Sequence, residues 1–245
     1  MFRVASYNIH KGVGLDRRRR PSRILDVIAE IDADIVALQE ADRRFFERRA
    51  VVDAGLLVEG AGDYKHVGVN LRPKSIGWHG NAILVREGAT ILHAEPLHLE
   101  AFEPRGAVLA EVDIGLGPMR IVGMHLDLSG LYRQRQVAQL LEILAPRPVM
   151  PTILMGDTND WNWGRRAAIP TVPGQYRIAP CGPSFHTRRP TLELDRIIYS
   201  ESIHLTDCGV HKSPTAKRAS DHLPIWADLE LLQAPASGSS GARYL

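Results

Sequence analysis

Short apolar runs along the chain end in polar side chains, and this pattern predicts buried strands with polar groups at one sheet edge. The run 35–38 is apolar throughout and is soon followed by Glu40, and the run 153–155 leads through a glycine into Asp157. Unbroken apolar runs between polar segments are typical of strands buried on both faces. Functional groups of open α/β sheets commonly lie at the carboxyl ends of such strands. The pattern therefore places candidate functional side chains at strand ends.

Helical periodicity is confined to two stretches. Apolar residues three and four apart predict a helix that contains 24–31 and a second over roughly 131–144, whose arginines are expected to face solvent. Further strands are predicted at 3–9, 64–70, 81–86, 89–95, 107–114, 119–126, 194–199, 202–210 and 223–232. The region 161–190 is predicted to be a long loop. Because strands outnumber helices, the pattern favours an α/β fold with two mixed β-sheets packed face to face and helices outside.

Length and composition are those of one globular domain. The 245 residues are 44% hydrophobic and 24% charged, and the formal net charge of +2 excludes a strongly basic, general polyanion binder. We expect a single domain over 1–232, followed by a disordered tail over 233–245 that is poor in apolar residues. The N-terminus lacks a signal-peptide pattern and no apolar run is long enough to span a bilayer, which predicts a cytoplasmic protein without membrane insertion.

The cysteines and arginines restrict the chemistry less. Cys181 and Cys208 lack the spacing of a zinc or redox motif, and we expect two free thiols. Arginines occur in pairs and runs at 17–20, 43–44, 48–49, 165–166 and 188–189. Such runs are usually solvated surface, but a phosphate-facing role for at least one of them stays open.

Oxygen and imidazole groups follow many of the predicted strands, and no cysteine is among them. The set comprises Asn8, Glu40, His125, Asp157, Asn159, Asp195, Asp221 and His222. Hard oxygen ligands suit Mg²⁺ or Mn²⁺ and are wrong for a structural zinc site. Phosphoryl transfer requires a cation, a group that orients water, and donors around the phosphate. The set therefore favours metal-assisted phosphate chemistry.

Seven motifs carry a resemblance to a known family. They are Ser6-Tyr7-Asn8-Ile9-His10, Ile35-Val36-Ala37-Leu38-Gln39-Glu40, Gly80-Asn81-Ala82-Ile83-Leu84, His125-Leu126-Asp127, Gly156-Asp157-Thr158-Asn159, Leu194-Asp195-Arg196-Ile197 and Ser220-Asp221-His222. In this order the chain resembles the endonuclease/exonuclease/phosphatase superfamily, and most of all its uncharacterised bacterial members. The resemblance implies a four-layered α/β sandwich and divalent-metal-dependent hydrolysis of phosphate esters.

The resemblance also implies roles for individual residues. Glu40 is expected to be the principal metal ligand, with Asn8 and Asp221 supporting the metal site. Asp157 is expected to orient or deprotonate the attacking water, and Asn159 to contact metal or phosphate.

His222 and Asp195 are expected to form a pair that holds the imidazole next to the phosphate. His125 is expected to stabilise the transition state and Asn81 to bind substrate. For Arg105 two interpretations stay open, a bidentate contact with a substrate phosphate and an ordinary surface arginine. His10 departs from the family pattern, because several of its nucleases have an Asp at this position. This departure puts the same support of the metal site in doubt.

The substrate is left open by the sequence. A nuclease is favoured by the arginines at 17–20 and the tryptophans Trp161 and Trp163, which offer phosphate contacts and a stacking surface. The small net charge and the moderate pI of about 8.6 argue against a nuclease. A second hypothesis is a phosphodiesterase or phosphatase acting on a phospholipid headgroup or a small phosphoester, because residues 7–14 resemble uncharacterised bacterial members of the family, some of which look linked to lipid metabolism. An inactive phosphate-binding module is the alternative from another class, and the complete residue set argues against it.

Overall fold

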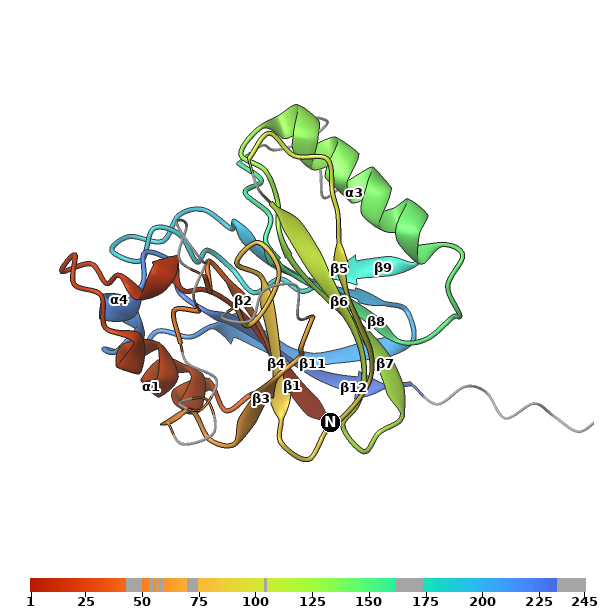
Figure 1. Ribbon diagram of the computed structural model, residues 1–245, viewed down its shortest axis with the longest axis horizontal. Coiled ribbons are helices and arrows are strands. Elements are labelled where there is room, and N and C mark those ends of the chain that lie inside the picture. The colour runs from red at the N-terminus through yellow and green to blue at the C-terminus, as the bar shows by residue number, and fades with distance from the viewer. Residues whose placement is uncertain are drawn as a thin grey trace, which may run out of the picture.

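Figure 1 shows the computed structural model of the chain, which describes residues 1–42, 50–52, 55, 57, 60–69, 75–103, 105–161 and 174–232. Within these residues two sheets of six strands each pack face to face. Helix α1 covers one sheet and helix α3 the other, on opposite sides of the molecule. The predicted four-layered α/β sandwich is therefore confirmed.

The first sheet has the strand order β11-β12-β1-β2-β4-β3. Its strands are β1 (Phe2–Asn8), β2 (Ile35–Gln39), β3 (Tyr64–His66), β4 (Ala82–Arg86), β11 (Ile203–Val210) and β12 (Ile225–Leu231). Strands β1 and β2 are parallel, with Asn8 paired to Gln39, and their neighbours are antiparallel. Because Glu40 directly follows Gln39, Asn8 and Glu40 lie at the same edge of this sheet.

The second sheet has the order β5-β6-β7-β8-β10-β9. Its strands are β5 (Thr90–Leu97), β6 (Gly106–Asp113), β7 (Pro118–His125), β8 (Thr152–Asp157), β9 (Tyr176–Ile178) and β10 (Asp195–Ser200). The parallel pair β7 and β8 sets His125 opposite Asp157, and the antiparallel pair β8 and β10 sets Asp195 opposite Asp157. Three predicted site residues thus share one line across the sheet.

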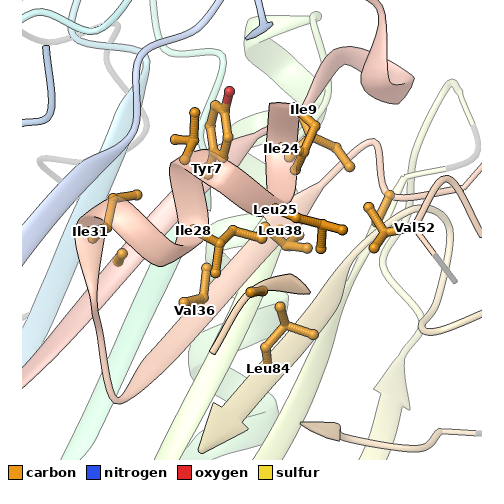
Figure 2. Packing of buried hydrophobic residues seen from close by; sticks show 14 of the residues in the cluster. Tyr7, Ile9, Ile24, Leu25, Ile28, Ile31, Val36, Leu38, Val52 and Leu84 are labelled. Carbon is orange, nitrogen blue, oxygen red and sulfur yellow. The ribbon is translucent and has the colours of Figure 1, made fainter. Parts of the chain in front are cut away.

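The helices bury one apolar face each. In α1 (Pro21–Ile31), Pro21 fits the first helical position, and the helix ends where Asp32 adopts a left-handed conformation. Figure 2 shows Leu25 and Ile28 of α1 lying over Val36 and Leu38 of β2, and all four side chains are buried. Full burial of such side chains stabilises the fold by about 1.5–3 kcal/mol each. Helix α3 (Gly130–Leu144) packs Val137 and other apolar residues on β7 and β8 in the same way.

Several sequence expectations need correction. The stretch 161–190 is not all loop, because it contains β9, which pairs with β10. The strand predicted at 64–70 ends at His66. Arg133 on α3 is buried and only 2% exposed, although the helical pattern placed its arginines in solvent. The chain also forms two short elements that were not predicted, the 3₁₀ turn η1 (His10–Gly12) and α4 (Ala216–Ala219).

Other expectations lie wholly or partly outside the described residues. They include the tail 233–245 and the arginines at 43–44, 48–49 and 165–166. Cys181 and Cys208 are free thiols, and burial raises the pKa of both. Among the described residues, no helix combines the length and the apolar character that a membrane span requires.

Candidate active site

A buried Asp–His pair forms the most sharply defined part of the site. Nδ1 of His222 lies 2.9 Å from Oδ2 of Asp195, and the side chains are 7% and 0% exposed. The hydroxyl of Ser184 also donates to the same carboxylate oxygen of Asp195. A pair anchored in this way fixes the ring orientation and directs Nε2 away from Asp195. The predicted partnership of these two residues is thus present in the structure.

Asp157 lies at the centre of the polar groups. Its Oδ2 accepts a hydrogen bond of 2.9 Å from Nδ2 of Asn8, and its Oδ1 accepts one of 2.9 Å from the backbone N–H of Asn159. Nε2 of His125 lies 3.3 Å from Oδ2 of Asp157, and Nε2 of His222 lies 3.7 Å from it. The two sheets therefore meet at Asp157, since Asn8 belongs to β1 and Asp157 to β8.

The ionisation of this group follows from its burial and its neighbours. Burial raises the pKa of Asp157 to about 6, although the charge of His222 opposes the rise. Burial alone would lower the pKa of His222, but the carboxylates of Asp195 and Asp157 outweigh it and raise the pKa to about 10. At neutral pH the site therefore holds the imidazolium of His222 beside an Asp157 that is mostly ionised.

His125 carries the opposite charge preference. Burial and the adjacent charge of Arg105 hold the pKa of His125 well below its ordinary value. Nη1 of Arg105 contacts Nε2 of His125, which fits a neutral ring whose Nε2 accepts from the guanidinium. Arg105 therefore lies at the site next to His125, and its predicted contact with phosphate stays a prediction.

Asn159 and Asp127 organise the loops around Asp157. Nδ2 of Asn159 donates to the carbonyl oxygen of Leu126 at 3.0 Å, and its backbone adopts φ 48°. Such a conformation is uncommon outside glycine and is often found at functional sites. Oδ2 of Asp127 accepts from the backbone N–H of Phe102 at 2.9 Å, which holds the loop that carries Arg105.

The edge of the first sheet carries a second, more exposed group of oxygens. Oε2 of Glu40 is ion-paired with the ammonium of Lys11. Oδ1 of Asp221 lies 3.7 Å from Nδ1 of His10. The hydroxyl of Ser220, next to Asp221, donates to the carbonyl oxygen of Asn8 at 2.7 Å. Glu40 and Asp221 are therefore joined to Asn8 through a turn and a loop, without a direct contact to Asp157 among the contacts of the described residues.

Asn81 differs from the other predicted residues. It is fully buried, and its Nδ2 donates to the carbonyl oxygens of Gly106 at 3.0 Å and Trp78 at 3.2 Å. Gly106 is paired with His125, so Asn81 supports the strand next to the site. Its predicted contact with substrate stays a prediction.

Sequence reasoning missed three residues that shape the site. Arg133 donates to the carbonyl oxygens of Asp127 and Leu128, and Ser184 fixes Asp195. Lys11 directly follows the first motif and was assigned no role. The arginine spacing on α3 hid Arg133, because an arginine followed by more arginines indicates a solvated face.

The donor sets differ in their fitness for a metal ion. Among the described residues, Asp157, Asp195 and His222 offer ligand atoms within 4.8 Å of one another. However, Nδ1 of His222 already faces Asp195 and its raised pKa keeps the ring protonated, so it is a poor ligand. Glu40 already holds a cation, the ammonium of Lys11, and oxygen donors of this kind fit Mg²⁺ or Mn²⁺. Glu40 thus offers an oxygen of the kind that a hard divalent ion binds.

These features define a class of protein: a sandwich of two mixed sheets with a buried, polar Asp–His site at the strand ends. The model of the Endonuclease/Exonuclease/phosphatase family matches residues 5–222 of the chain. The chain belongs to this family, whose members hydrolyse phosphoester bonds. A search of curated proteins found no match.

Solved structures show the same fold. The chain is similar to an endonuclease/exonuclease/phosphatase protein from Bacteroides thetaiotaomicron, with 21% identity, a TM-score of 0.72, and coverage of 95% of this chain and 98% of that one. A similar protein from Bacteroides vulgatus has 19% identity, a TM-score of 0.72, and coverage of 94% and 98%. D. rerio TDP2 complexed with a single-strand DNA product has 17% identity, a TM-score of 0.71, and coverage of 94% and 98%.

Proposed function

We propose that the protein is a divalent-metal-dependent phosphohydrolase that cleaves a phosphate ester by in-line attack of a water molecule. The observation that carries this proposal is the convergence of the Asp195–His222 pair, Asn8 and His125 on Asp157, a carboxylate buried to 2% exposure. A buried carboxylate with a raised pKa next to fixed donors is a typical general base. Family membership limits the reaction to phosphoester chemistry.

The residues of the chain divide the work as follows. Asp157 orients water through a carboxylate oxygen and accepts its proton, while Asn8 and the backbone N–H of Asn159 hold that carboxylate in place. The imidazolium of His222 donates from Nε2 to a phosphate oxygen, and Asp195 preserves its charge. Fixed donors of this kind stabilise the charge that develops in the transition state.

Arg105 and a metal ion at Glu40 would supply the positive charge that balances the phosphate. The guanidinium of Arg105, held against His125, supplies a cation for a phosphate oxygen. Glu40, with Asn8 and Asp221 nearby, would hold a Mg²⁺ or Mn²⁺ ion that withdraws charge from the phosphate oxygens when it is bound. Asn159 is available to contact the metal or the phosphate from the opposite loop.

A nuclease is the second candidate, and Trp161 favours it. The indole is 44% exposed, follows the loop of Asp157 and Asn159, and lies 5.6 Å from the ring of Phe185. Phe185 in turn lies 4.7 Å from His222. An exposed aromatic ring next to a phosphate site offers a surface on which a base can stack. The similar D. rerio protein carries single-strand DNA, which supports the same candidate.

One panel separates the candidates. The protein is incubated with Mg²⁺ or Mn²⁺ and, in separate reactions, plasmid, abasic oligonucleotide, bis-p-nitrophenyl phosphate and phospholipid vesicles. Cleavage of the small diester or of the lipid headgroup alone supports a small-ester or lipid phosphohydrolase. Nicking that weakens steeply with salt supports the nuclease. Absence of turnover on all substrates, with phosphate still bound, would show an inactive binding module and overturn the proposal.

A further inference from the structure

Lys11 is ion-paired with Glu40, the residue that we propose as the metal ligand. The ammonium of Lys11 is ion-paired with Oε2 of Glu40, and the two side chains are only 28% and 21% exposed. An ion pair at the protein surface would have little meaning, because solvent screens such pairs. This one is partly covered and lies at the edge of the first sheet, next to Asn8.

The backbone of the first loop specifies this position for Lys11. The turn η1 is held to the site because Oδ1 of Asn8 accepts the backbone N–H of His10 at 3.0 Å. Lys11 itself has φ 54°, a left-handed conformation that is costly for a residue with a side chain. Gly12 follows with φ 69°, and a Cβ there would lie 2.8 Å from Cγ1 of Val51. The strained turn η1 thus positions the side chain of Lys11 next to Glu40.

Two cations cannot share this carboxylate without repulsion. A divalent ion needs direct contact with the Glu40 oxygens, and Mg²⁺ in particular requires a near-octahedral set of close ligands. A lysine ammonium is a mobile point charge on a flexible stem, so it can leave the carboxylate at modest cost. We infer that Lys11 competes with the metal for Glu40: its ammonium neutralises Glu40 in the metal-free protein, and a divalent ion binds there by displacing it.

From its position beside Glu40, Lys11 also influences the phosphate side of the site. The charge of Lys11 is near enough to His125 to help lower the pKa of that imidazole. The exchange replaces the single positive charge on Glu40 with a double one. The competition from Lys11 lowers the affinity of Glu40 for metal ions, so only doubly charged ions at sufficient concentration occupy the site.

The inference is tested by metal affinity, measured on the full chain without substrate. Mn²⁺ is titrated calorimetrically into the metal-free wild type and into Lys11→Met, which keeps an unbranched side chain as far as Cε and removes the charged ammonium. We expect Lys11→Met to bind Mn²⁺ about fivefold more tightly, the factor equivalent to a partly exposed ion pair. The control is Lys65→Met, whose ammonium contacts the carbonyl oxygen of Glu87 at 2.5 Å, and its affinity should equal that of the wild type.

Glu40→Gln separates this inference from the proposed function on which it rests. If Glu40 holds the ion, Glu40→Gln weakens Mn²⁺ binding, and adding Lys11→Met to it no longer tightens binding. Unchanged affinity in Glu40→Gln would reject the metal role of Glu40 itself. Weaker binding in Glu40→Gln together with unchanged or weaker binding in Lys11→Met would overturn the competition alone.

Lys11→Arg provides a second variant should Lys11→Met fail to fold, as judged by circular dichroism. A guanidinium can hold both oxygens of Glu40 and is harder to displace, so we expect weaker Mn²⁺ binding than in the wild type. Equal or tighter binding in Lys11→Arg would contradict the competition.

Discussion

The imidazole of His222 is held by Asp195 through a contact of 2.9 Å between Nδ1 and Oδ2, in a site where both side chains are almost completely buried. Burial disfavours the imidazolium, so its raised pKa depends on the carboxylates around it. The Asp195–His222 pair thus converts a residue that titrates near neutrality into a permanent cation next to Asp157.

Removal of this carboxylate should deprive His222 of its charge. We expect Asp195→Asn to lower the pKa of His222 from about 10, because burial then acts against the imidazolium and only the charges of Asp157 and Asp221 oppose it. The alkaline limb of the pH–rate profile should move to lower pH, and kcat should fall by roughly 10²–10⁴-fold. NMR titration of the His222 ring checks the pKa directly.

A matched control for this variant is Asp228→Asn, which removes a carboxylate paired with Arg3 on β1. Arg3 and Asp228 lie far along the strands from Asn8, and the control should keep the activity and the pKa of His222. If Asp195→Asn kept the wild-type pKa of His222 and the wild-type rate, the Asp195–His222 pair would have only a structural role.

Asp157 should reveal its burial through its own titration. In the metal-free protein we expect its carboxyl group to titrate near pH 6, well above the ordinary value, because burial disfavours the charged form. Carboxyl ¹³C NMR of Asp157 measures this pKa. A titration near pH 4 would contradict the assignment of Asp157 as a buried base.

The raised pKa of Asp157 also makes the stability of the protein depend on pH. A carboxyl group with a raised pKa in the folded state stabilises the protein at low pH, and this contribution is lost as pH rises from about 4 through about 6. Asp157→Asn avoids the loss, so the metal-free variant should be more stable than wild type at pH 7 by on the order of 1–3 kcal/mol. Urea unfolding of both proteins at pH 4 and pH 7 tests this expectation, because the difference between their free energies of unfolding should be small at pH 4. The Asp157→Asn variant should show no turnover at either pH.

Arg105 offers a test of how His125 is kept neutral. Arg105→Met removes a neighbouring cation, so the pKa of His125 should rise towards its ordinary value while burial still holds it low. Loss of one fixed donor to the phosphate should lower kcat by about 10²–10³-fold. Kinetics and NMR titration of His125 measure both effects, with Arg105→Lys expected to keep the pKa low and recover part of the rate. Unchanged kcat in Arg105→Met would exclude a phosphate contact.

Much of this site could be predicted from strand ends. Asp157 follows one apolar run and Asp195 begins another, so the sequence pattern alone places both residues at strand ends. Their meeting with Asn8 and His222 required the resemblance to a family, because periodicity does not say which strands become neighbours. The sheet order sets His125 and Asp195 on either side of Asp157, and this order depends on long-range pairing.

Residues that act through others could not be predicted in this way. Ser184 lies in a segment read as loop, and its value arises only because the chain folds back to place its hydroxyl on Asp195. Arg133 reads as a solvated helix residue, but the loop that follows β7 supplies it with the carbonyl oxygens of Asp127 and Leu128. The loop that follows β8 adds Oδ1 of Asp160, which lies 3.7 Å from Nη2 of Arg133. Helical periodicity reports the face of a helix and not the loops at its end.

Gly156 should be irreplaceable, although it takes no part in the chemistry. A Cβ at this position would lie 1.8 Å from the carbonyl oxygen of Met124 on the parallel neighbour β7, and neither strand backbone can withdraw. We expect Gly156→Ala to lower the free energy of unfolding by more than about 3 kcal/mol, because overpacking against backbone forces strands apart. It should also displace the adjacent Asp157 and abolish turnover. Urea denaturation measures the loss, with Gly88→Ala as the control, since a Cβ at Gly88 meets nothing within 4 Å. Equal stability of the two variants would show that the β7–β8 pairing is looser than the structure indicates.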